Sequence, residues 1–159
     1  MIDSSPFIDR DRALALLALV GAVEAGAREE VPVGAVLSDS WGRLLAQGGN
    51  NPITAHDPVG HAEIITMRKA CGRVGNYRLP GARMVVTLEP CPLCLEALKI
   101  SRISEVYFVS GQSSENLGGL GRLSVVPWSE QEEKQGDLGM ILQASSGILR
   151  FFFARRRGI

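Results

Sequence analysis

This chain of 159 residues is organised around two short stretches, His61-Ala62-Glu63 and Pro90-Cys91-Pro92-Leu93-Cys94. Together they offer one imidazole and two thiolates, which are the nitrogen and sulfur ligands that zinc takes in a tetrahedron. A catalytic zinc site keeps its fourth position open for water, and that water loses a proton near neutral pH. The two stretches therefore predict one zinc ion held by His61, Cys91 and Cys94.

Glu63 follows the histidine by two residues and is not needed as a ligand. A carboxylate beside activated water can take a proton as general base and return it to a leaving amine as general acid. We therefore expect Glu63 to be the catalytic residue of a reaction that releases an amine.

The spacing of the two cysteines suits the start of a helix. Residues three apart lie on the same side of one helical turn, so Cys91 and Cys94 point the same way. Pro90 and Pro92 fit the first turn, where a missing N–H costs nothing. The positive end of the helix dipole would favour both thiolates.

The alternatives are a purely structural zinc site or no metal at all. A closed structural site needs four protein ligands, and the only further candidates are Cys71 and His56. Cys71 has no C-x-x-C partner, and His56 precedes Asp57-Pro58 in an expected turn. A structural site would also leave Glu63 unexplained, so we favour the catalytic interpretation.

Composition sets limits on the class of protein. The length suits one domain, 1–159, with a full core, and 45% hydrophobic residues are ordinary for a soluble protein. The formal net charge of zero excludes a global field that attracts nucleic acid, although a local basic patch could still bind one. Three cysteines, two of them in C-x-x-C, indicate metal chemistry in a reducing, cytoplasmic compartment.

The apolar run from Leu14 to Val23 is the only stretch that invites a membrane interpretation. It is too short to span a bilayer, and acidic residues precede it, so it lacks the positive region of a signal peptide. We expect a core helix there and no membrane partner.

Hydrophobic patterning predicts alternating helices and strands. We expect a first helix capped by Ser4 or Asp9 and running to about Ala27, then helices over 60–72 and 92–100 and from about Ser145 to the C-terminus. Expected strands are 33–37, 43–47, 83–88, 105–109 and 138–143. The order of strand, helix and strand over 83–109 implies a parallel pair, and the whole predicts an α/β sandwich with the site at helix N-termini beside the sheet.

Four polar segments can be interpreted from their position alone. Asn50 stands in a Gly- and Pro-rich stretch, where turn chemistry is the simpler interpretation, although an amide could also bind a base edge. Residues 112–121 form a long glycine-rich loop, and 130–134 form a charged surface. The terminal arginines 155–157 either complement a helix dipole or, with residues 151–153 beside them, contact a nucleic-acid backbone.

The chain resembles the cytidine deaminase-like superfamily. It is most similar to the bacterial tRNA-specific adenosine deaminases, which convert the wobble adenosine of a tRNA anticodon to inosine. The resemblance runs from about residue 12 to the C-terminus. It rests on the two zinc stretches and on Glu30-Val31-Pro32-Val33-Gly34-Ala35-Val36, the Asn50 loop with Pro52, His56-Asp57-Pro58, Asn76-Tyr77-Arg78-Leu79, Thr87-Leu88-Glu89-Pro90-Cys91, Ser101-Arg102-Ile103 and the closing aromatic and arginine residues.

The resemblance implies a fold and a set of roles. The fold would be a three-layer α-β-α sandwich with a five-stranded mixed sheet, and each subunit of a homodimer would hold one Zn²⁺. Asn50 would hydrogen-bond the target base, and the backbone around Val33 would wall the pocket. The RNA surface, which would receive a tRNA anticodon loop, would include Phe152, Arg155, Arg156 and Arg157.

One segment departs from the resemblance. The tRNA enzymes usually carry a lysine- and glycine-containing loop after the fourth strand, whereas this chain has Gln112-Ser113-Ser114-Glu115-Asn116-Leu117-Gly118-Gly119. A missing cation weakens the case for RNA, because phosphate contacts dominate nucleic-acid affinity. Residues 61–75 also resemble guanine deaminases. A deaminase of free guanine or cytosine, or of a related small heterocyclic base, therefore stays an alternative, as does a non-catalytic RNA-binding subunit, although the intact Glu63 argues against the latter.

Overall fold

The computed structural model describes residues 6–111, 123–127 and 135–158. Its five strands form one sheet in the order β2-β1-β3-β4-β5. The strands are β1 (Gly34–Ser38), β2 (Leu44–Gly49), β3 (Arg83–Leu88), β4 (Glu105–Ser110) and β5 (Ser124–Pro127). The helices are α1 (Pro6–Ala27), α2 (Pro52–Ala55), α3 (Ala62–Val74), α4 (Pro92–Ile100) and α5 (Gln135–Arg157).

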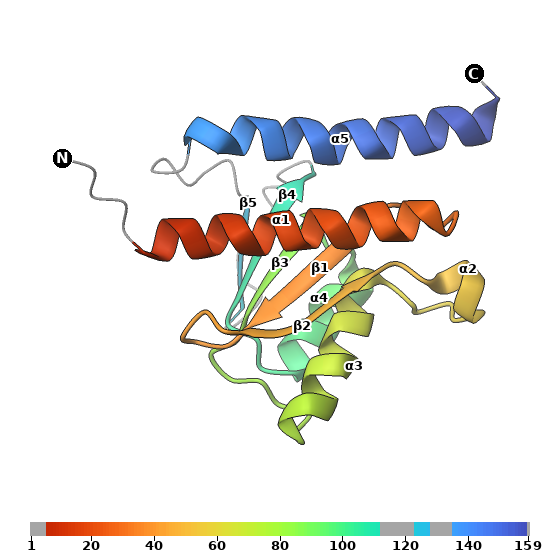
Figure 1. The fold of residues 1–159 in the computed structure, drawn as a ribbon. Coiled ribbons are helices and arrows are strands. Elements are labelled where there is room, and N and C mark those ends of the chain that lie inside the picture. Colours follow the sequence, from red (N-terminus) through yellow and green to blue (C-terminus); the bar gives the residue numbers. More distant parts are fainter. Residues whose placement is uncertain (1–5, 112–122, 128–134, 159) are drawn as a thin grey trace.

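The sheet is mixed and is covered on both faces. Strand β1 pairs antiparallel with β2 and β3, and β3, β4 and β5 run parallel to one another. Figure 1 shows α1 and α5 on one side of the sheet and α3 and α4 on the other. The predicted three-layer sandwich with a five-stranded mixed sheet is thus confirmed.

Helix α1 lies very close to the β1–β2 hairpin because glycines line the contact. A Cβ atom at Gly34 would overlap the carbonyl oxygen of Ala18 and the amide nitrogen of Ala22, and one at Gly49 would overlap the carbonyl oxygen of Gly21. Only glycine permits such a close approach of helix backbone to strand backbone. This contact fixes the hairpin, and with it the segment after β2 that enters the site.

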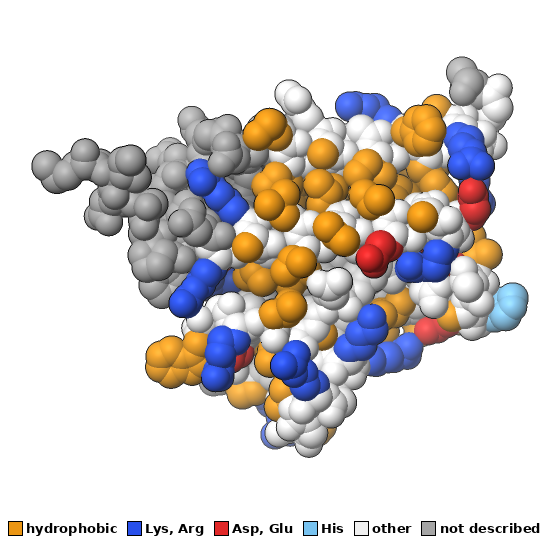
Figure 2. Space-filling model, viewed as in Figure 1, with side chains coloured by type: hydrophobic (Ala, Val, Ile, Leu, Met, Phe, Trp, Pro, Cys, Tyr) orange, Lys and Arg blue, Asp and Glu red, His pale blue; other side chains and the backbone are white. Residues whose placement is uncertain are grey.

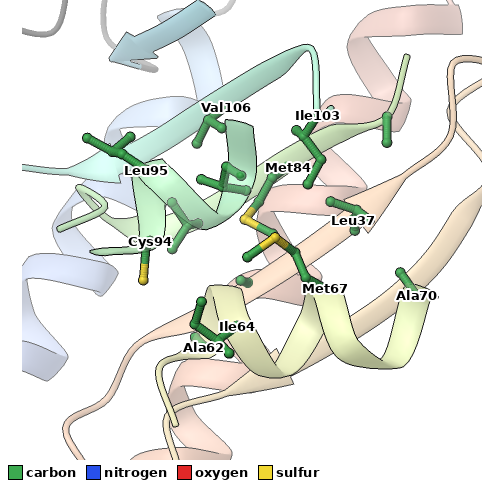
Figure 3. Packing of buried hydrophobic residues seen from close by; sticks show 14 of the residues in the cluster. Leu37, Ala62, Ile64, Met67, Ala70, Met84, Cys94, Leu95, Ile103 and Val106 are labelled. Atoms are coloured by element: carbon green, nitrogen blue, oxygen red, sulfur yellow. The ribbon is translucent and has the colours of Figure 1, made fainter. Parts of the chain in front are cut away.

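The core has two parts, one on each side of the sheet. The larger cluster fills the space between the sheet and α3 and α4, and includes Leu37, Met67, Met84, Leu98 and Val106. Figure 3 shows Cys94 at the border of this cluster, pointing from α4 towards the first turn of α3. The smaller cluster lies under α1 and α5 and includes Ala15, Val36, Val85 and Ile141. The zinc stretches are therefore held on a fully packed layer.

The predicted strand over 138–143 is wrong, because these residues lie inside α5. The fifth strand is the four-residue β5, Ser124–Pro127. A short apolar run fits a buried strand and a buried helix equally well, and here packing of α5 against α1 and β4 selects the helix. The expected end helix accordingly begins ten residues before Ser145.

The prediction that Asp9 caps the first helix is wrong. Helix α1 begins at Pro6, so Asp9 lies within the helix, and Ser4 lies outside the described residues. The loop over 112–121 and the charged surface over 130–134 lie outside them as well.

The outer face of α1 and α5 carries exposed apolar side chains. Figure 2 shows them gathered over the two helices, and they include Leu16, Val20, Val23, Met140 and Phe151. Among the helices the structure describes, none is long and apolar enough to cross a membrane. The apolar run at Leu14 to Val23 is part of α1, which packs one side on the sheet and exposes apolar side chains on the other.

Candidate metal centre

His61, Cys91 and Cys94 meet where two helices begin. His61 is the residue before α3 and Cys91 the residue before α4, both with extended backbones, at φ −71° and ψ 152° and at φ −72° and ψ 165°. Pro92 opens α4, as its fixed φ favours. Because α3 and α4 lie on the same side of the sheet, their N-termini aim the three side chains at one point.

The distances fit a tetrahedral zinc ion. The Nδ1 atom of His61 lies 3.5 Å from the Sγ of Cys91 and 3.4 Å from the Sγ of Cys94. Zinc–sulfur and zinc–nitrogen bonds of about 2.3 and 2.0 Å, set at the tetrahedral angle, require a separation of about 3.5 Å. Within the described part of the chain these three residues form the only such group, and it leaves the fourth position without a protein ligand.

The electrostatics of the cluster also call for a cation. Burial raises the pKa of the Cys94 thiol, and the neighbouring Glu63 and Cys91 raise it further. Burial likewise raises the pKa of Glu63, which is 4% exposed. Two thiols and a carboxyl packed together around one imidazole are costly to ionise, and a divalent metal ion supplies the missing positive charge. His61, Cys91 and Cys94 are therefore placed to hold one zinc ion.

Glu63 lies in the first turn of α3, beside the cluster but outside the ligand set. Its carboxylate lies within hydrogen-bonding range of the Cys94 thiol, and His61 lowers its pKa against the effect of burial. This is the position that a proton carrier next to the open metal site needs.

Asn50 and Val33 lie together at the edge of the site. The carbonyl of Val33 accepts a hydrogen bond from the amide N–H of Asn50 at 3.0 Å. The side-chain Oδ1 of Asn50 accepts one from the backbone N–H of Ala62 at 2.8 Å, which ties it to the first turn of α3. Since the oxygen is thus engaged, the side-chain amino group is the part of Asn50 that remains for a ligand.

Glu30 is a site-supporting residue that sequence reasoning missed. It is fully buried, and its carboxylate accepts hydrogen bonds from the backbone N–H groups of Ile53, at 3.2 Å, and Thr54, at 2.7 Å. These bonds join the turn before Val33 to the segment after Asn50. The available signal was a carboxylate directly before the apolar stretch that begins at Val31.

The other two metal-ligand candidates stay outside the cluster. His56 is exposed in a left-handed conformation at the end of α2. Cys71 is half-buried in α3, and its Sγ lies 3.6 Å from the carbonyl oxygen of Tyr77. The position of His56 agrees with the turn expected from the sequence.

The C-terminal residues predicted to form the RNA surface make contacts within the chain. Phe152 is buried and lies under the Arg156 guanidinium. Arg155 forms an ion pair with Glu29 at 3.2 Å, and Arg156 donates to the Glu29 carbonyl at 2.8 Å. Arg157 donates to the Phe153 carbonyl, as an arginine at a helix end often does. Much of this segment anchors α5 to the end of α1.

The fold and this centre define a class of protein. The chain belongs to the family described as the cytidine and deoxycytidylate deaminase zinc-binding region, which matches residues 8–110. It is accordingly a zinc-dependent hydrolytic deaminase that acts on a C–N bond.

Individual proteins similar to this chain include deaminases of tRNA and of guanine. The chain is 40% identical over 144 residues to a tRNA-specific adenosine deaminase of Agrobacterium fabrum, covering 89% of this chain and 92% of that protein. A solved structure from work on A-to-I editing by tRNA:A34 deaminases at the wobble position matches with a TM-score of 0.62 and 36% identity, covering 73% of this chain and 98% of that chain. A guanine deaminase of Bacillus subtilis is 39% identical over 79 residues, 50% of each chain.

Proposed function

We propose that this protein deaminates the wobble adenosine of a tRNA anticodon loop to inosine. The observation that carries the substrate assignment is the 40% identity to a tRNA-specific adenosine deaminase over nearly the full length of both proteins. Hydrolysis adds water to the base and releases ammonia, so the site must activate water, move one proton and hold a base. The described residues supply a group for each task.

His61, Cys91 and Cys94 would hold a zinc ion, whose Lewis-acid chemistry would make water a stronger nucleophile near neutral pH. Glu63 takes a proton from the attacking water and delivers it to the departing amine. Its burial supports this role, because a raised pKa brings a carboxyl closer to the range in which it can both accept and donate.

The base is held by the two ends of the β1–β2 hairpin, at Val33 and Asn50. The Asn50 amino group donates to an acceptor on the base edge, while its oxygen stays on Ala62. The backbone at Val33 forms one wall of the pocket. The Val33 carbonyl accepts a hydrogen bond from the backbone N–H of Asn50, which holds this wall next to the donating side chain. A base in an RNA loop reaches such a pocket only when it is splayed out of the stack.

The proposal includes the domain organisation, the oligomeric state and the cellular compartment of the protein. The chain acts as a single domain over 1–159, as a homodimer and in the cytoplasm. Exposed apolar side chains such as Leu16, Val20 and Val23 support an assembly larger than one chain. Sedimentation of the zinc-loaded protein tests the dimer, and a monomer at all concentrations would contradict it.

Arg155, Arg156 and Arg157 remain candidates for contacts with the RNA backbone. Replacing all three by alanine is expected to weaken hairpin binding and to lower its salt dependence. The variant also loses the contacts to Glu29, so its melting temperature is measured in parallel. Unchanged binding at low salt would remove these residues from the RNA surface.

The second candidate function is deamination of a free base, which the match to a guanine deaminase over half of the chain favours. The two functions are separated by offering zinc-loaded protein an anticodon hairpin with a loop adenosine and, in parallel, free guanine and cytosine. Inosine in the hairpin supports the proposal. Ammonia from a free base with an unchanged hairpin would replace it.

A further inference from the structure

A cavity among the described residues lies away from the zinc centre. It has a volume of about 680 Å³ and is formed by the segment after α3, the end of α4 and the residues leading into β4. The zinc ligands lie at the opposite end of α4. Since α4 has nine residues, the two sites are about 13 Å apart along the helix.

Three cations line this cavity, and two of them have no acidic partner among the described residues. Lys99 is paired with Glu96 at 2.5 Å. Arg78 and Arg102 are exposed, and no ion pair within the described ranges involves either. In a chain with a formal net charge of zero, this is a local excess of positive charge.

Arg102 keeps its place at a conformational cost. Its backbone φ is 60°, in the left-handed region where glycine or asparagine is usual. An arginine there costs about 1 kcal/mol relative to the ordinary helical region. The turn geometry does not explain why residue 102 is an arginine. A requirement for its positive charge at the cavity would explain it.

An aromatic side chain stands beside the two arginines. Tyr77 is 58% exposed, and the Arg78 guanidinium lies 5.1 Å from the centre of its ring. Ile100, also exposed, and the buried Ile103 add an apolar surface. Exposed aromatic and apolar side chains next to arginines form the kind of groove that binds single-stranded nucleic acid by stacking and phosphate contact.

We propose that this cavity, lined by Tyr77, Arg78 and Arg102, is a second RNA contact, which holds the backbone of the strand whose adenosine enters the zinc site. The inference rests on the proposed function. RNA fits better than a free nucleotide because the cations stand on two separate exposed segments.

The test is the salt dependence of binding to an anticodon hairpin by zinc-loaded protein. Each lost phosphate contact lowers the slope of log affinity against log salt by about 0.7 for a single strand. Raising the salt from about 50 to 200 mM lowers the hairpin affinity of both proteins. The factor by which it falls should be about seven times smaller for the double variant Arg78→Ala/Arg102→Ala than for wild type. The KM of the double variant for the hairpin should rise. Arg150→Ala removes an exposed arginine from α5, on the other side of the sheet, and should leave the slope unchanged.

Glu96→Gln gives a test in the opposite direction. It frees Lys99 from its ion pair and should increase both hairpin affinity and the salt slope. Glu96 is exposed, so the change should not disturb folding.

The outcomes separate this inference from the proposed function. If the double variant deaminates the hairpin and its affinity depends on salt as that of wild type does, the second RNA contact is overturned and the proposed function stands. If the wild-type protein neither binds nor deaminates the hairpin, the proposed function is overturned. Competition by free AMP that depends on Arg78 and Arg102 would instead assign the cavity to a nucleotide. A changed sedimentation coefficient in the double variant would assign this face to a subunit contact.

Discussion

Replacing the buried Glu30 is expected to lower stability and to change its dependence on pH. The Glu30 carboxylate accepts hydrogen bonds from the backbone N–H groups of Ile53 and Thr54. A hydrogen bond to a charged group contributes about 1.5–3 kcal/mol. Glu30→Gln keeps one accepting oxygen and should cost about 2 kcal/mol, whereas Glu30→Ala loses both bonds and should cost about 4 kcal/mol.

The sign of the pH dependence follows from the pKa of Glu30. Burial alone would raise it, but the hydrogen bonds from Thr54 and Ile53 and the charge of Arg28 outweigh burial and hold the pKa below its ordinary value. A carboxyl with a lowered pKa stabilises the folded state fully above its unfolded pKa, and this contribution is lost as the pH falls through the folded pKa. The difference between wild type and Glu30→Gln should thus be constant near neutral pH and shrink below about pH 4.3.

Urea denaturation of both proteins at a series of pH values measures this difference directly. Effects of acid on zinc binding or on other carboxyls are shared by the two proteins and cancel. Glu96→Gln is the matched control, because Glu96 is exposed and its surface ion pair should contribute less than about 1 kcal/mol. Equal unfolding free energies for wild type and Glu30→Gln, or a difference that grows as the pH falls, would refute the reasoning.

Three further predictions concern the site and its support. Glu63→Ala should keep one zinc per chain by metal analysis and lower turnover by at least about 10²-fold; loss of the metal would show that Glu63 is a ligand. Gly34→Ala should lower the unfolding free energy by about 1–3 kcal/mol or more, because the added methyl meets the backbone of α1; an unchanged urea midpoint would contradict the close packing. Removal of zinc by a chelator should lower the melting temperature, and added zinc should restore it; an apo-protein with the same melting temperature would show that the folded state does not bind the metal.

The zinc centre could be predicted from sequence because its chemistry and its local structure agree. The C-x-x-C spacing and Pro92 predict a helix start, and the structure has α4 at those residues. The hydrophobic run over 83–88 predicts the strand that delivers Cys91, and β3 has those bounds. Here local propensity and tertiary packing point to the same result.

The C-terminal third could not be predicted, because the local signals there are ambiguous. Residues 138–143 are apolar and contain Gly139, which suggests a strand between turns, yet α5 runs through them and packs on α1. The burial of Phe152 and the fixed contacts of Arg155 and Arg156 also depend on where α1 ends. The role of Glu30 depends in the same way on a contact with residues more than twenty positions away.

Inosine formation in a tRNA anticodon hairpin with a wobble adenosine tests the proposed function most directly. The zinc-loaded wild-type protein is compared with Glu63→Ala, and nucleosides are analysed after digestion. We predict inosine with wild type and none with Glu63→Ala, although the variant still holds zinc. An unchanged hairpin with wild type, or inosine at an equal rate with Glu63→Ala, would contradict the account.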